Sequence, residues 1–198
     1  MLATRRLHWL LGPALRPVLA NVLFALVGPA MVAVAWAQPW DDPMQELRLR
    51  KLLLPVASVS AAQLSDTYTQ SRAAGRPHEA LDIMAPRGTP VLAVENGRVA
   101  KLFLSKPGGI TLYQFDPHAE FAYYYAHLDR YADGLTEGAP LVRGQVVGYV
   151  GSTGNASLDA PHLHFAVFKL GPERQWWKGT ALNPFLLWRA DALGSHTP

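Results

Sequence analysis

The chain has 198 residues, of which 49% are hydrophobic and 17% are charged. This length supports one well-packed core, and the composition excludes both a disordered acidic chain and a membrane protein with many spans. Sixteen glycines and sixteen prolines predict many turns, and the absence of cysteine excludes disulfides, thiolate metal sites and a cysteine nucleophile.

The formal net charge of +3 comes from the first 37 residues, which carry Arg5, Arg6 and Arg16 and no acidic residue. Because three of the 18 basic residues lie there, the remainder has 15 basic and 15 acidic residues. No concentrated run of Lys and Arg remains for neutralising phosphates. We therefore expect no nucleic-acid partner.

Residues 1–37 have the pattern of an export signal. The arginines precede an apolar stretch at residues 18–34, and small residues follow at Ala35 and Ala37, which suits a signal peptidase. We predict cleavage after Ala37. The alternative is an uncleaved membrane anchor through residues 18–34, since this stretch reaches the lower limit for a membrane span. Either outcome places the rest of the chain outside the cytoplasm.

Residues 38–70 are predicted to be a connecting segment that packs on the main domain. A short amphipathic helix is expected at residues 44–53, where Pro55 stops it. The main domain is predicted at residues 71–190, followed by a tail at residues 191–198.

The main domain is predicted to consist of short strands separated by turns. An Asn-Gly pair at Asn96 and Gly97 favours a hairpin, and a turn around Asp116 favours a second one. The pattern predicts a mainly β fold, a compact antiparallel sheet domain with short peripheral helices. The expected strands are residues 91–94, 98–104, 110–115, 121–127, 142–150 and 162–168.

Two pairs of residues suggest metal chemistry. His162 and His164 are two apart, so on a strand both leave from one face, with Leu163 on the other. His78 and Asp82, four apart in H-E-A-L-D, also share a face if that segment is a strand. Imidazole and carboxylate ligands without thiolate are typical of a Zn²⁺ site that keeps one position open for water.

The H-E-A-L-D segment also suggests the helical zinc-protease motif H-E-x-x-H, in which the glutamate acts as a base. Prolines at 77, 86 and 90 leave no room for such a helix. On the strand interpretation Glu79 faces away from the metal.

Several blocks of sequence, in order, resemble the LytM or lysostaphin-type zinc metallopeptidases of peptidase family M23, which cut peptides of bacterial peptidoglycan. The resemblance runs from about Gly75 to Phe168. It implies the fold of that family, the duplicated hybrid motif type. The blocks are H-E-A-L-D-I-M-A-P-R-G-T-P-V, Y-A-H-L, R-G-Q-V-V-G-Y-V-G-S-T-G and P-H-L-H-F.

Transferred residue by residue, the resemblance implies that His78, Asp82 and His164 bind zinc. It makes His127 and His162 the unligated catalytic pair. Spacing alone leaves open which of His162 and His164 binds the metal. The implied function is that of an exported zinc endopeptidase that hydrolyses cross-links or stem peptides of peptidoglycan by a zinc-activated water.

Two other functions remain open at this point. One is a non-catalytic module that binds peptidoglycan or regulates another hydrolase, and the other is a metallopeptidase that acts on an extracytoplasmic protein.

Strand alternation places Tyr123 and Tyr125 on the face of His127, so Tyr125 is expected to contact substrate. Trp176 and Trp177 suit either packing of a C-terminal loop or stacking on a sugar.

Overall fold

A computed structural model describes residues 42–72 and 75–189. The predicted export signal and the predicted tail lie outside these residues. The described residues belong to one compact unit. In the described part of the chain, no helix has the length and apolar character needed to cross a membrane.

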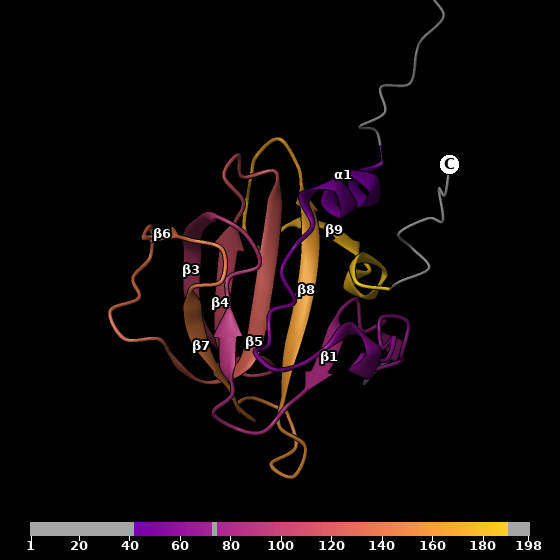
Figure 1. Ribbon diagram of the computed structural model, residues 1–198, viewed down its shortest axis with the longest axis vertical. Coiled ribbons are helices and arrows are strands. Elements are labelled where there is room, and N and C mark those ends of the chain that lie inside the picture. The colour runs from indigo at the N-terminus through magenta and orange to yellow at the C-terminus, as the bar shows by residue number, and fades with distance from the viewer. Residues whose placement is uncertain (1–41, 73–74, 190–198) are drawn as a thin grey trace, which may run out of the picture. The chain divides into compact units, whose positions relative to one another are not determined.

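The centre of the protein is a nine-stranded antiparallel sheet, in which the strands run in the order β1-β8-β5-β4-β3-β6 (Figure 1). In addition, β9 pairs with β8, β7 pairs with β5, and β2 pairs with β7. The mainly β, antiparallel prediction is confirmed. The strands are β1 (Leu81–Met84), β2 (Pro90–Leu92), β3 (Gly97–Ser105), β4 (Gly109–Phe115), β5 (Phe121–Tyr131), β6 (Pro140–Leu141), β7 (Val146–Val150), β8 (His162–Leu170) and β9 (Gly179–Leu182).

The helical elements are short and peripheral, as the composition suggests. The α-helix α1 (Pro43–Arg50) precedes the sheet, together with the 3₁₀ turn η1 (Ala61–Gln63), and the 3₁₀ turn η3 (Pro184–Leu187) follows it. Helix α1 starts one residue earlier than predicted, because the Asp42 side chain caps it by accepting a hydrogen bond from the Met44 amide. It ends at Arg50, since Lys51 adopts a left-handed conformation.

The hairpin predicted at Asn96 and Gly97 is wrong. Strand β2 pairs with β7, while β3 pairs with β4 and β6. Both residues serve other purposes: the Asn96 side chain accepts a hydrogen bond from the Arg143 amide, and a Cβ at Gly97 would lie 2.0 Å from the carbonyl oxygen of Phe115. The second predicted hairpin is confirmed as β4 and β5.

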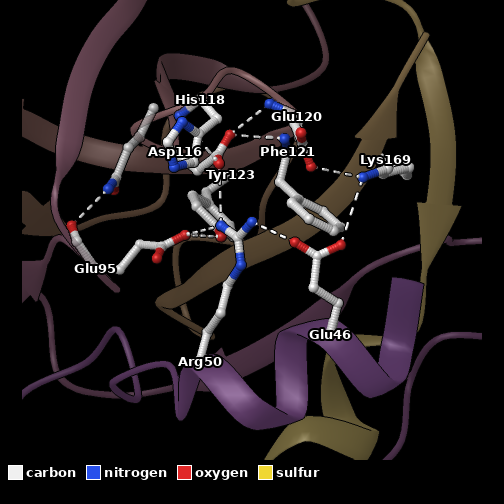
Figure 2. Close-up of polar contacts among 10 residues, drawn as sticks. Glu46, Arg50, Glu95, Asp116, His118, Glu120, Phe121, Tyr123 and Lys169 are labelled. Atoms are coloured by element: carbon white, nitrogen blue, oxygen red, sulfur yellow. Dashed lines mark hydrogen bonds and ion pairs between the residues drawn. The ribbon is translucent and has the colours of Figure 1, made fainter. Parts of the chain in front are cut away.

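Helix α1 is joined to the sheet by a set of partly buried charges (Figure 2). Arg50 donates hydrogen bonds to Glu46 on the same helix, to Glu95 at 3.1 Å and to Asp116 at 3.0 Å. Asp116 is fully buried and also accepts from the backbone amides of Glu120 and Phe121. Burial opposes the charge of Arg50, but the hydrogen bonds to Glu46 and Asp116 outweigh it and raise its pKa.

Candidate active site

Three potential metal-binding side chains converge where β1 meets β8. Antiparallel pairing sets Asp82 of β1 directly opposite His164 of β8. His78 precedes β1, and the chain turns at Glu79, which has a φ of 54°. The strand predicted through H-E-A-L-D therefore begins only at Leu81, and the turn, not strand alternation, brings His78 to Asp82. Glu79 is exposed, as expected.

The donor atoms of these three residues form a compact triangle. His78 Nε2 lies 3.0 Å from Asp82 Oδ1 and 2.9 Å from His164 Nδ1, and His164 Nδ1 lies 3.2 Å from Asp82 Oδ1. A tetrahedral zinc site with bonds of about 2.0–2.2 Å places its ligand atoms about 3.3 Å apart. The two imidazoles and one carboxylate therefore fit a zinc ion both in chemistry and in spacing.

Neighbouring groups hold these side chains in place. The Nδ1 atom of His78 lies 2.9 Å from the carbonyl oxygen of Thr67, so this nitrogen carries the proton and Nε2 presents its lone pair to the triangle. The Thr67 hydroxyl accepts a hydrogen bond from the Asp82 amide at 2.9 Å. Arg72 forms an ion pair with the outer oxygen of Asp82, Oδ2, which leaves Oδ1 facing the imidazoles.

Burial and hydrogen bonding set the charges of the triangle. Burial opposes ionisation of Asp82, but the adjacent rings of His164 and His78 outweigh it and hold the pKa of this carboxyl well below its usual range. Burial also lowers the pKa of His164. The set thus offers an ionised carboxylate and the neutral imidazole of His164, the forms in which these groups bind a metal ion.

His127 and His162 face the same region without belonging to the triangle. Their rings are 4.9 Å apart, and the His127 ring is 5.6 Å from that of His164. Each Nδ1 donates to a backbone carbonyl at 2.8 Å, of Thr153 for His127 and of Ala160 for His162. Each Nε2 is left with a lone pair for other chemistry. Burial lowers the pKa of His127 to about 4.

The structure corrects the assignment of Tyr125 to substrate binding. Tyr125 is fully buried, and its hydroxyl donates to the Gln114 side chain and accepts from the Val94 amide. Tyr124 lines the pocket instead, with its ring 5.8 Å from that of His164. The reason is a bulge in β5 between Tyr125 and Leu128, where the pairing with β4 shifts and His127 adopts a φ of 60°. An added residue reverses the strand alternation.

The carbonyl group that orients His127 depends on two glycines. A Cβ at Gly154 would lie 2.3 Å from the carbonyl oxygen of Pro107, and one at Gly109 would lie 2.2 Å from the Thr153 hydroxyl. Only glycine permits this approach between β4 and the loop before β8. The loop is further fixed because Thr153 donates from its hydroxyl to the Leu128 carbonyl and accepts from the Ile110 amide.

The four predicted histidines and Asp82 line one open pocket of about 490 Å³. Residues that the sequence analysis missed also line it, namely Arg72, Arg76 and Tyr124. The loop before β8 contributes residues 155–157 to the rim. Of the two tryptophans, Trp176 packs on Tyr113 at a ring distance of 4.8 Å, whereas Trp177 is 62% exposed.

The geometry agrees with a comparison to known sequences. Residues 76–184 match peptidase family M23, which is more than half of the chain, so the chain belongs to this family. The family resemblance implied by the sequence is therefore confirmed.

Three curated relatives illustrate the range of this family. The chain is 33% identical over 117 residues to the L-Ala--D-Glu endopeptidase of Bacillus subtilis, covering 56% of this chain and 36% of the relative. It is 38% identical over 93 residues to the DD-carboxypeptidase/endopeptidase Mpg of Neisseria meningitidis, covering 46% and 20%. For lysostaphin of Staphylococcus simulans the identity is 36% over 95 residues, covering 46% and 18%. The chain thus spans only a fifth to about a third of these relatives.

Solved structures show the same fold. Csd3 of Helicobacter pylori superposes with a TM-score of 0.53 at 29% identity, covering 70% of this chain and 34% of that one. The catalytic domain of lysostaphin from Staphylococcus simulans gives a TM-score of 0.50 at 26% identity, covering 71% and 93%. The expected LytM or lysostaphin-type fold is confirmed.

Proposed function

We propose that this protein is an extracytoplasmic zinc endopeptidase that hydrolyses peptide bonds of peptidoglycan. The observation that carries the proposal is the triangle of His78, Asp82 and His164 with two further imidazoles beside it in one open pocket. Membership of a peptidase family supports hydrolysis, and relatives named for cleavage of L-Ala--D-Glu or glycyl-glycine bonds support a cell-wall substrate. The location outside the cytoplasm rests on the sequence of residues 1–37.

In this proposal His78, Asp82 and His164 hold the metal ion. Zinc, when bound, lowers the pKa of a water molecule and polarises the scissile carbonyl group. Arg72 and the Thr67 hydroxyl keep the Asp82 carboxylate in position, and the Thr67 carbonyl holds the tautomer of His78. Such outer contacts sustain metal affinity in other sites.

The remaining two histidines handle protons and developing charge. His127 is neutral at pH 7 because burial lowers its pKa to about 4, so its Nε2 can accept a hydrogen bond and then a proton from the attacking water. His162, fixed by the Ala160 carbonyl, presents a second Nε2 to the same space. Together they orient the water, stabilise the oxyanion and return a proton to the leaving amine.

The test separates metal binding from turnover. Purified peptidoglycan is incubated with the full chain, and released peptides are identified by mass spectrometry with and without a chelator. We expect zinc-dependent release. His164→Ala should lose both tightly bound zinc and activity, whereas His127→Ala should retain zinc and lose turnover.

Other outcomes lead to other functions. Binding to peptidoglycan with bound zinc but without released peptide would favour a non-catalytic module. Cleavage of an unfolded protein such as casein, with no action on peptidoglycan, would favour a protein substrate. Equal activity of His164→Ala and the unmodified chain would contradict the proposed site.

A further inference from the structure

The charged side chains around the pocket carry a net positive charge. Of the described residues that line it, only Arg72, Arg76 and Asp82 carry a formal charge when the histidines are neutral. Asp82 faces His78 and His164 with one oxygen and Arg72 with the other, so this carboxylate is fully engaged. Bound zinc would add two further positive charges. The entrance therefore favours an anionic group.

Of the two arginines, Arg76 is the one available to bind a ligand. It is exposed, and within the described residues its guanidinium has no carboxylate partner. Arg72 is committed to Asp82, though a guanidinium has five donors and this pair uses only part of them. An unpaired guanidinium is suited to bind a carboxylate through two parallel hydrogen bonds.

Backbone hydrogen bonds tie both arginines to the site. The Arg72 amide donates to the Arg76 carbonyl at 2.8 Å, and the Gly75 amide donates to the Arg72 carbonyl at 3.0 Å. Immediately afterwards the His78 amide donates to the Gln70 carbonyl at 3.0 Å. The arginines are thus held beside a proposed metal ligand. Arg76 and the triangle line the same pocket, so a peptide bound at the triangle can also reach Arg76.

We propose that Arg76 forms a carboxylate-binding subsite at the rim of the pocket, so that the protein prefers peptides with a free carboxylate close to the scissile bond. This inference rests on the proposed function and narrows its substrate. It favours acidic stem peptides over neutral glycine bridges. The curated relatives leave this choice open, since their names include both L-Ala--D-Glu and glycyl-glycine endopeptidases.

The test uses two synthetic peptides that are identical except that the acidic residue next to the mapped cleavage position carries a carboxylate or a carboxamide. With the zinc-loaded full chain we expect kcat/KM to be about 10-fold or more higher for the carboxylate. Arg76→Gln should reduce this preference to less than about 3-fold, mainly through KM, and Arg76→Glu should reverse it. Arg143→Gln, an exposed arginine outside the pocket, is the matched control and should change neither value.

A binding measurement makes the result independent of turnover. The same peptides are titrated into the chelator-treated chain by calorimetry at low and high salt. The carboxylate should bind more tightly, and the difference should shrink with salt and vanish in Arg76→Gln. Equal affinity of both peptides for the unmodified chain would overturn the subsite and leave the proposed function intact. A clear binding preference without any cleavage by the zinc-loaded chain would support the subsite and overturn the proposed function.

Discussion

His127 combines an unusual backbone conformation with a buried ring. Its φ of 60° places it at the bulge of β5, and its ring donates to the Thr153 carbonyl. Left-handed conformations of residues other than glycine are uncommon and occur often at functional sites. The site therefore depends on backbone geometry as much as on the identity of the histidine.

The lowered pKa of His127 predicts a pH dependence of stability. Its pKa falls from 6.5 to about 4 on folding, so the unfolded chain binds more protons between these values and stability decreases as the pH falls through this window. The loss amounts to about 3 kcal/mol at most. Denaturant unfolding of the chelator-treated protein at pH 7 and pH 4.5 measures it.

His127→Gln should reduce this pH dependence, and His118→Gln, in an exposed turn, serves as the control. The burial of His164 acts in the same direction, so part of the slope should persist in the His127 variant. An unchanged slope in His127→Gln would contradict the prediction.

The four histidines and Asp82 of the site could be predicted from the sequence, but the backbone carbonyl groups that orient these side chains could not. Histidines and an acidic residue stand out in any sequence, and the five that were singled out converge. The Thr67 and Thr153 carbonyls carry no sequence signal, because every residue has a carbonyl group. Arg76 was missed since an exposed arginine becomes noticeable only when its surroundings are known.

Strand β5 is the element on which the site depends most. It pairs with β8 so that Ala126 lies opposite His164, and its bulge then turns His127 toward the pocket. Three consecutive tyrosines, Tyr123 to Tyr125, give no hydrophobic alternation that distinguishes one face from the other. Counting alternate residues back from His127 ignores the bulge, so it predicts Tyr125 in the pocket where the structure has Tyr124.

The contact between β4 and the loop before β8 predicts the effect of Gly154→Ala. The new Cβ would meet the Pro107 carbonyl oxygen at 2.3 Å, so the loop must move and Thr153 with it. We expect kcat to fall by about 10-fold or more, since small displacements of catalytic groups are costly. Peptide release assays with the zinc-loaded variant measure this effect.

Gly134→Ala is a matched control for the backbone strain alone. Gly134 has a φ of 73°, close to the 76° of Gly154, but nothing lies within 4 Å of its Cβ position. Both variants should lose about 1–2 kcal/mol of stability from the left-handed conformation. Only Gly154→Ala should lose activity beyond that, and equal activity of the two would show that the close approach is not needed.

On the scale of the whole molecule, Arg50 joins helix α1 to two distant parts of the sheet. Its positive charge balances Glu95, before β3, and the buried Asp116, after β4 (Figure 2). Tyr123 also donates its hydroxyl hydrogen to Glu95. The sequence predicts that these residues pack on the main domain, but hydrophobic patterns alone do not reveal the charge network that α1 completes there.

Removal of this cation should destabilise the entire fold. Arg50→Ala leaves Asp116 buried without its counter-charge, and we expect a loss of about 3–5 kcal/mol in the free energy of unfolding. Lys101→Ala removes a more exposed pair with Glu137 and should cost less than about 1 kcal/mol. Thermal and denaturant unfolding compare the two, and a similar small loss for both would contradict the assigned role of Arg50.

Helix α1 also determines where the protein can be truncated. The region that matches the family starts at residue 76, but Leu47, Leu52 and Val56 are core residues with at most 6% exposure, and Arg50 neutralises acids within that region. We expect a fragment trimmed to the matched boundaries to carry every proposed catalytic group and yet to fold poorly, because it lacks these core residues and the counter-charge of Asp116. Chimeras that exchange specificity with relatives should therefore be joined upstream of Asp42.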